Sequence, residues 1–476
     1  MKKNTVKYII NTMLGAAMLA GAVAVGIFLL READAPAEQS GTDASAAYQQ
    51  IKDLTEGDLQ TEVWGASHIP SATAYNDSVM EGESGWYLVG GEWDVETLGY
   101  HQQMRYMDAA TGEQTVLCVK PQCTHDTEYC TASNSRYPGV AQVYYEGFLY
   151  GLSTDTTKVP SWEHVDEEEG YYQAAGDILL MRYAPDGTAL EKLLSFEKAI
   201  PEPLDEVTLG AVEMIAHRGG LWISVIFVRE RCIRRAHETG MEEQPYIYYW
   251  ESSQIEHGYG LFHYDIRNDK LTAVIYESPK EKYSPTAPFQ LRGMGDHVYF
   301  LKSNTDWADP YNGDRLYRVN IRTGELEKLR EDVWAFYGLT EDSVVYLQKA
   351  NTLKNTVVYD VYIMDIATGQ SRLFLEQGDY VVGVQCTEDY VFTVKFNEFF
   401  DICIYDWNGD LLQTIEQPMK QPYLDADMPF DINACCYPCI SGDRLYVMSQ
   451  HKETNTHCTD FSDAAEQGMV SWRQIY

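Results

Sequence analysis

The sequence predicts an all-β fold: a β-propeller of seven four-stranded blades, preceded by one N-terminal transmembrane helix. A tight turn followed by an apolar, tyrosine-rich strand recurs seven times, a second turn after a Tyr-Asp-like pair recurs six times, and residues 8–30 are apolar and uncharged. The chain has 476 residues, which is too long for one ordinary core. A fold that grows by adding repeated units suits this length.

Residues 8–30 predict a membrane-spanning helix. The stretch exceeds the roughly 20 apolar residues needed to cross the hydrocarbon core of a bilayer. Lys2, Lys3 and Lys7 precede it, and cationic residues favour the cytoplasmic side, so residues 1–7 are expected to be a cytoplasmic tail. The segment is then a signal anchor. The protein is expected to be a single-pass protein of the cell membrane with the bulk of the chain extracellular.

The next region predicts a tether. Residues 31–60 are rich in Ala, Glu, Asp, Ser, Gly and Gln and lack a hydrophobic period, which is typical of a flexible acidic linker. The run Ala33-Asp34-Ala35 leaves a cleaved signal peptide open as an alternative to the anchor. The propeller is expected to span residues 61–476.

Composition excludes one class of partner. Lys and Arg number 36 against 72 Asp and Glu, which gives a formal net charge of −36. Such a charge repels a phosphate backbone, so no nucleic acid is expected to bind. The chain has 35 tyrosines against 15 phenylalanines, a ratio typical of β-strands with one solvent-exposed face.

Each repeat contains two hairpins. The seven turns that open an apolar strand lie at Gly85, Gly147, Gly220, Asp296, Asp342, Asp389 and Asp443. The second hairpin is clear in six units, as in RYMDAATGEQTVL. Regular strand spacing also allows a pair of antiparallel β-sandwiches, but two distinguishable hairpins in fixed order favour propeller blades. The seventh unit is a strand short, and residues 61–65 are predicted to complete it.

This repeat resembles the TolB-like and related Tyr-Asp/Thr-Gly propellers. It is more similar still to uncharacterised membrane-anchored propellers of Gram-positive bacteria with a cysteine-rich loop, here LCVKPQCTHDTEYC at 117–130. The resemblance covers about residues 60–476. It implies an extracytoplasmic interaction or sensing module and brings no catalytic residue to this chain.

The cysteine-rich loop places three thiols and one imidazole close together in sequence, at Cys118, Cys123, His125 and Cys130. A Cys3His set can hold a tetrahedral structural zinc ion. The spacing is not that of a standard zinc finger, and an extracellular location allows thiols to oxidise. A disulfide and a metal site both remain open, and in either case we expect a local staple rather than a redox catalyst.

We expect different roles for the cysteines outside this loop. A second cluster, Cys435, Cys436, Cys439 and Cys458, is expected to hold the connection into the last blade by a disulfide. Cys386 and Cys403 lie on or beside strands and are expected to be buried small hydrophobic residues.

Two insertions supply a candidate ligand face. The blade-two insertion is acidic, and the blade-three insertion carries arginines. The residues of the candidate ligand face are Trp162, Tyr246, Tyr248, Trp250, Arg229, Arg231, Arg234 and Arg235. Exposed charge pairing between the loops is the simpler interpretation. The alternative is a cationic, aromatic patch for an anionic glycan, peptide or envelope protein.

The functional expectation follows from these patterns. The chain lacks the G-x-S-x-G, H-E-x-x-H, G-x-x-x-x-G-K and G-x-G-x-x-G motifs. The prediction is a non-enzymatic extracytoplasmic propeller that binds, senses or scaffolds a glycan, peptide or envelope protein. The alternative is a glycan-active hydrolase or lyase with carboxylates near the propeller pore, because propeller enzymes gather such pairs from different blades.

Overall fold

A computed structural model describes the greater part of the repeat region. The described residues are 68–69, 78–94, 99–123, 130–132, 139–155, 163–164, 169–172, 177–196, 208–238, 246–281, 288–302, 314–350, 359–376, 380–396, 400–416, 437–441, 444–449, 455–460 and 473–474. The predicted tail 1–7, anchor 8–30 and linker 31–60 lie outside them. Among the described residues, no helix is long and apolar enough to cross a membrane.

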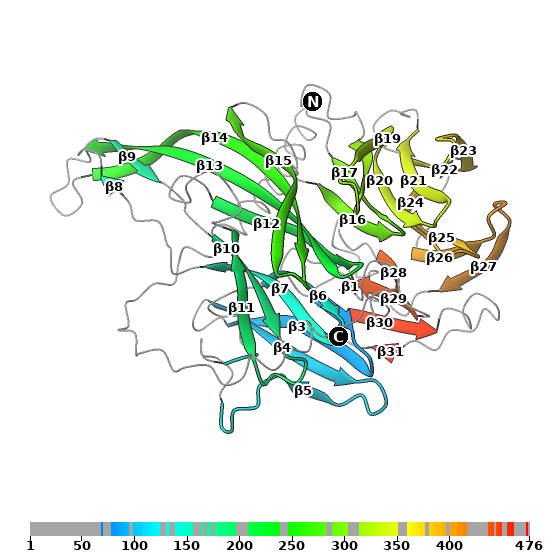
Figure 1. The fold of residues 1–476 in the computed structure, drawn as a ribbon, viewed down its shortest axis with the longest axis horizontal. Coiled ribbons are helices and arrows are strands. Elements are labelled where there is room, and N and C mark those ends of the chain that lie inside the picture. Colours follow the sequence, from blue (N-terminus) through cyan, green and yellow to red (C-terminus); the bar gives the residue numbers. More distant parts are fainter. Residues whose placement is uncertain are drawn as a thin grey trace, which may run out of the picture.

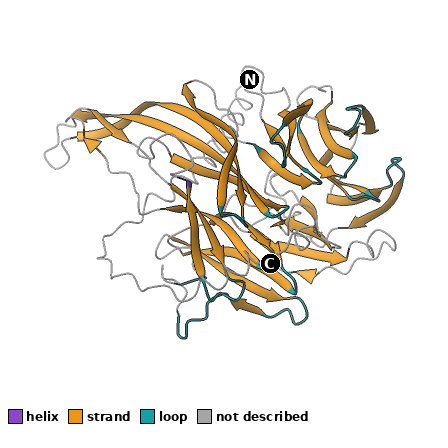
Figure 2. Cartoon of the chain, in the orientation of Figure 1, coloured by secondary structure: helices purple, strands orange, loops and turns teal. Residues whose placement is uncertain are grey.

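The described part of the chain is built almost wholly of strands, which form seven antiparallel sheets (Figures 1 and 2). The first sheet has the order β1 (His68–Ile69), β2 (Ser78–Glu81), β3 (Gly85–Asp94), β4 (Gly99–Asp108), β5 (Gln114–Val116). The second runs β6 (Gly139–Tyr145), β7 (Phe148–Asp155), β10 (Asp177–Tyr183), β11 (Leu190–Ser195). The third contains β12 (Thr208–His217), β13 (Gly220–Glu238), β14 (Tyr246–Asp265) and β15 (Lys270–Glu281), joined by β8 (Glu163–His164) and β9 (Glu169–Tyr172).

The remaining sheets have four strands each, in chain order. The fourth sheet has β16 (Phe289–Met294), β17 (His297–Lys302), β18 (Asp314–Asn320), β19 (Leu326–Val333). The fifth has β20 (Ala335–Leu339), β21 (Ser343–Lys349), β22 (Tyr359–Asp365), β23 (Ser371–Leu375). The sixth has β24 (Tyr380–Cys386), β25 (Val391–Phe396), β26 (Phe400–Tyr405), β27 (Leu411–Glu416). The seventh has β28 (Tyr437–Ser441), β29 (Arg444–Ser449), β30 (Asn455–Asp460), β31 (Arg473–Gln474).

The predicted hairpins are confirmed. Each of the seven first turns joins two paired strands, from β2 and β3 in the first sheet to β28 and β29 in the last. The six second hairpins are also present, from β4 and β5 to β26 and β27. This arrangement of successive four-stranded sheets is that of a β-propeller.

The second hairpins share a side-chain cap. In the fifth sheet, Asp365 Oδ1 accepts hydrogen bonds from the backbone N–H and the hydroxyl of Thr368, both at 2.7 Å. Gly369 then adopts φ 66°, a left-handed conformation in which a side chain is strained. Asp108 and Thr111 repeat the pattern in the first sheet. Local turn chemistry therefore explains why this part of the repeat is visible in the sequence.

The core lies between successive sheets, and the fifth sheet is buried on both faces. Along β21, Val344 and Tyr346 pack against the fourth sheet, whereas Val345 and Leu347 pack against the sixth. Alternate strand residues point to opposite faces, so one strand serves two neighbouring cores. Such serial packing is expected of a propeller and not of a sandwich pair.

One strand at the inner edge of each sheet contacts its counterpart in the neighbouring sheet, and we call these the inner strands: β2, which is flanked by the short β1, and β6, β12, β16, β20, β24 and β28. Each contacts the inner strand of the next sheet. The short strand β1 pairs with β2 and also contacts β28, so the first and last sheets lie side by side.

The predicted closing strand, residues 61–65, lies outside the described part of the chain. Among the described residues, β31 pairs with β30 as the fourth strand of the last sheet. The unit looked a strand short because β30, NTHCTD, has few apolar residues and no alternating pattern.

The blade-three insertion is also not a loop. Strands β13 and β14 continue as one long hairpin, paired from Gly220 opposite Asp265 to Glu238 opposite Tyr246. Beyond Val228, β13 no longer pairs with β12 and instead pairs with β9 from the blade-two insertion. We call residues 229–238 and 246–255, together with β8 and β9, the arm; Figure 1 shows it projecting from the body of the molecule.

Candidate functional site

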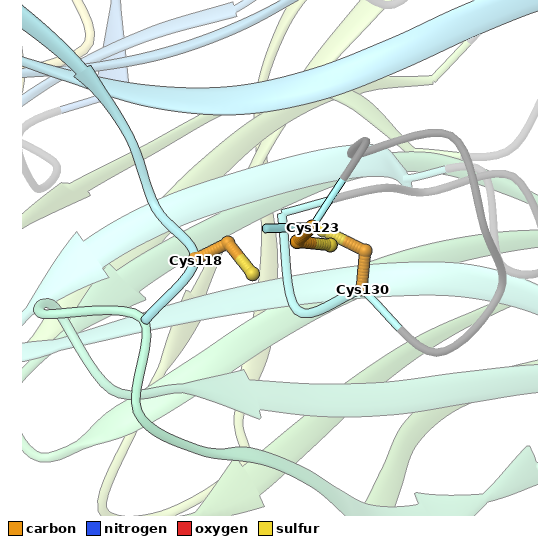
Figure 3. Close-up of side chains that lie close together, drawn as sticks. All are labelled: Cys118, Cys123 and Cys130. Atoms are coloured by element: carbon orange, nitrogen blue, oxygen red, sulfur yellow. The ribbon is translucent and has the colours of Figure 1, made fainter. Parts of the chain in front are cut away.

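The cysteine-rich loop brings three thiols together. Cys118 follows β5, Cys123 ends the next turn, and Cys130 lies after residues 124–129, which are outside the described part. The three sulfur atoms all lie within 4.8 Å of one another (Figure 3). None of these three cysteines forms a disulfide. The predicted fourth member, His125, falls in the segment that is not described.

The thiol cluster is fixed by the core beneath it. Cys130 is buried, and Cys118 and Cys123 pack against the same apolar cluster, which includes Leu117 and Leu149 and lies between the first two sheets. Burial on this side orients the three side chains toward one another. The cluster therefore belongs to the packed body of the protein rather than to a free loop.

A second set of contacts ties the cluster to the turn between β10 and β11. The Thr131 hydroxyl lies 2.9 Å from the Gly187 carbonyl oxygen and 3.2 Å from that of Leu117, and it can donate to either. Gly187 adopts φ 73°, and a Cβ there would lie 2.5 Å from the Leu117 oxygen. Only glycine allows this approach of the two backbones.

Local hydrogen bonds also change the acidity of Cys118. Burial raises the pKa of this thiol, but hydrogen bonds from the Lys120 backbone and from the Cys130, Thr131 and Cys123 side chains outweigh it and lower the pKa to about 6. The cluster therefore favours the thiolate form, which is the form that coordinates soft metal ions.

The disulfide expected of the second cysteine cluster falls only partly on described residues. Cys439 in β28 and Cys458 in β30 both lie opposite Tyr446 of β29. One intervening strand separates their Cα atoms by about 10 Å, too far for a disulfide. Cys435 and Cys436 lie outside the described part. Cys386 and Cys403 are buried, as predicted.

The candidate ligand face is found on the arm. Arg229, Arg231, Arg234 and Arg235 lie in β13, and Tyr246, Tyr248 and Trp250 lie in β14, while Trp162 is outside the described residues. In register, Arg234 is opposite Trp250, and Arg235 is opposite both Tyr249 and Glu169 of β9. The two oppositely charged insertions therefore meet as paired strands.

A further site, which the sequence did not reveal, lies between two inner strands. Glu213 of β12 accepts a hydrogen bond from the backbone N–H of Leu291 in β16, 3.0 Å from Oε2. Its Oε1 lies 3.5 Å from Nη1 of Arg292, and these two side chains are 20% and 16% exposed. Glu213 and Arg292 are therefore partly accessible to solvent at the inner edge of the sheets.

The environment of Glu213 favours its neutral form. Burial raises the pKa of Glu213, and this effect outweighs the opposing influence of Arg292 and of the backbone N–H groups of Leu291 and Gln290. A carboxyl group with a raised pKa keeps its proton to a higher pH than usual and can give that proton to a substrate.

Glu213 owes its position to a backbone irregularity that recurs. The pairing of β12 with β13 is interrupted by a bulge between Ala211 and Glu213. Comparable bulges interrupt the inner strands β6, β16, β20 and β24. A bulge re-aims the side chain beside it, and bulges occur often next to active sites.

The next inner strand offers a neutral counterpart of Glu213. Gln290, within the bulge of β16, accepts a hydrogen bond from the backbone N–H of Phe336 in β20 at 3.0 Å. The same inter-sheet contact is therefore made once by a carboxylate and once by an amide.

No protein-family model matches this sequence, and no curated protein matches it. Similar solved structures include the propeller domain of the Trilobed protease from Pyrococcus furiosus, at 10% identity and a TM-score of 0.41, covering 83% of this chain and 95% of that one. Another is a Mycobacterium tuberculosis puromycin-hydrolyzing peptidase, at 10% identity and a TM-score of 0.43. An oligogalacturonate lyase from Vibrio parahaemolyticus has 10% identity and a TM-score of 0.37, covering 72% of this chain and 90% of that one.

The alignment with the mycobacterial peptidase covers 87% of this chain but only 56% of the peptidase. The chain therefore spans about half the length of such peptidases. These similar structures are enzymes or the propeller domain of one. On this finding the prediction of a non-enzymatic binding, sensing or scaffold module is wrong; the similarity itself, at 10% identity, shows a propeller-like fold.

Proposed function

We propose that this protein is a glycan-active hydrolase or lyase whose reaction takes place at the inner edge of the propeller. The observation that carries the proposal is Glu213: a partly exposed carboxyl group with a raised pKa, placed beside a bulge of an inner strand and next to Arg292. Cleavage of a glycosidic bond by either route needs a proton for the departing oxygen.

In this proposal protonated Glu213 is the general acid. Its proton goes to the glycosidic oxygen as the bond between that oxygen and carbon breaks. In hydrolysis a water molecule supplies hydroxide to the carbon and loses its other proton to a base. In elimination a base removes a proton from the sugar and a double bond forms. Arg292 then stabilises the Glu213 carboxylate that is left behind.

We also propose the finer architecture and location. The seven sheets form a closed, seven-bladed ring related to the TolB-like propellers, as the repeated turns and the contact between β1 and β28 support. The apolar residues 8–30 and the lysines before them support a single-pass anchor that holds the propeller outside the cytoplasm. A glycan of the cell envelope is the substrate class that such a position would offer.

The test compares two variants of the full-length protein on a panel of purified glycans, with new chain ends measured as product. Glu213→Gln keeps an acceptor for the Leu291 N–H, as Gln290 does for Phe336 in the next sheet, but removes the acid. We expect it to lower cleavage by roughly 100-fold or more. Gln290→Ala is the matched control, because it removes the equivalent inter-sheet bond and should leave cleavage largely intact.

Equal cleavage by Glu213→Gln and the wild-type protein would contradict the role of Glu213. Absence of cleavage on every glycan tested, by a folded wild-type protein, would contradict the proposed function itself.

A further inference from the structure

We propose that Cys118, Cys123 and Cys130 bind one zinc ion, which acts as a structural staple between the first two sheets. The site is independent of the proposed glycan cleavage, because it lies at the outer strand β5 and not at the inner strands that carry Glu213. It is also separate from every contact of that carboxylate described above.

The geometry of the thiols suits a tetrahedral ion. Zinc–sulfur bonds are about 2.3 Å, so two thiolates on one zinc ion lie roughly 3.8 Å apart. The three sulfur atoms are all within 4.8 Å of one another, and small rotations of the side chains bring them to that separation. The fourth coordination position is left for a ligand outside this set.

A disulfide explains the cluster less well. It would join two sulfurs and leave the third thiol beside the bond, where thiolate attack can break it. Zinc uses all three sulfurs at once. In the structure none of the three is in a disulfide, and each packs on the same apolar cluster.

The site would connect two sheets. Cys118 directly follows Leu117, whose carbonyl lies next to Gly187 in the turn after β10, and Cys130 is followed by Thr131, which also reaches Gly187. An ion held by Cys118 and Cys130 would fix both segments against that turn. Its loss would loosen the contact between the first and second sheets.

The experiment measures zinc content and cysteine accessibility in the full-length protein. We expect one zinc per chain by elemental analysis and by native mass spectrometry. A thiol reagent should label Cys118, Cys123 and Cys130 after a chelator is added, without any reductant. A chelator should also lower the melting temperature, and added zinc should restore it.

Variants assign the ion. Cys118→Ser and Cys123→Ser, both at partly exposed positions, should lose the zinc, whereas Cys403→Ala, which replaces a buried cysteine in the sixth sheet, should keep it. Cobalt in place of zinc gives a second readout, because thiolate ligands produce a charge-transfer absorption that Cys123→Ser should weaken. Labelling that requires a reductant and not a chelator would identify a disulfide and overturn the proposal. Zinc retained at full stoichiometry by a protein that lacks all three cysteines would also overturn it.

Discussion

Glu213 is a residue at which burial and ionisation oppose each other. Its folded-state pKa is raised above the ordinary value of 4.5. The stability that this provides is therefore fully present below pH 4.5 and is lost as the pH rises through the folded-state pKa.

Glu213→Gln should remove this dependence, because the amide stays neutral at every pH. We expect the variant to become more stable than the wild-type protein as the pH rises above 4.5, with the difference levelling off once Glu213 is ionised. Urea unfolding across this range measures it. Gln290→Glu is the matched reverse change and should lose stability with rising pH. A pH-independent difference between wild type and Glu213→Gln would contradict the raised pKa.

Gly369 tests the turn chemistry of the repeat. Its φ of 66° disfavours any side chain with a Cβ, although no other atom lies within 4 Å of the position that Cβ would take. Gly369→Ala should therefore destabilise the protein by roughly 1 kcal/mol through backbone strain alone. Gly369→Asp should cost less, because Asp269 adopts φ 51° in the third sheet. Equal losses for the two variants, measured by denaturant unfolding, would argue against strain as the cause.

At the same residue scale, sequence reasoning found one site and missed the other. The thiols of Cys118, Cys123 and Cys130 are close in the chain, so their proximity was visible from spacing. Glu213 and Leu291 are 78 positions apart and meet only because β12 and β16 are neighbouring inner strands. The one acidic residue in the mostly apolar strand β12 is the signal that the sequence offers for this site.

At the scale of elements, what the sequence predicted was local. The hairpins were predicted because Asp365, Thr368 and Gly369 and their equivalents specify each turn within five residues. Strand β30 was missed because it has no apolar alternation. The sequence predicts loops for the arm, because the strands of the arm pair with each other and with β9 outside the repeated blade.

The arm should be dispensable for folding. Pairing of β13 with β12 ends at Val228, and pairing of β14 with β15 ends at Glu256. Beyond these residues, the described part of the hairpin pairs with itself and with β9. Replacing residues 230–255 with an Asn-Gly turn should leave one cooperative unfolding transition and change the melting temperature by only a few degrees. Loss of cooperative unfolding would show that the third sheet depends on the arm. The variant also tests whether Arg231, Arg234 and Trp250 contribute to glycan cleavage.

At the scale of the whole molecule, packing is serial, and each sheet depends on its neighbours. Val345 of the fifth sheet packs toward the sixth, and Val344 packs toward the fourth. Repeat architectures of this kind gain stability from interfaces between units. The repeat pattern predicts this architecture. It does not predict β31, the strand that completes the last sheet, because residues 473–474 carry no repeat signal.

The proposed anchor predicts a specific membrane behaviour. Full-length protein should remain with the membrane after carbonate extraction, and protease added to intact, wall-stripped cells should digest the propeller. Replacing two central residues of the apolar stretch, Ala20 and Ala22, with Arg should reduce membrane insertion, because a charge in the bilayer centre costs about 3 kcal/mol. Release of a soluble chain beginning near Asp34 would identify a cleaved signal peptide instead.

The pH dependence of glycan cleavage tests the proposed role of Glu213 most directly. A general acid works only while it holds its proton, so the rate of glycan cleavage should fall as the pH rises through the raised pKa of Glu213. This decline should be absent from the residual activity of Glu213→Gln. A wild-type rate that stays constant or increases through that range, or a Glu213→Gln variant with the same profile as the wild-type protein, would contradict the assignment.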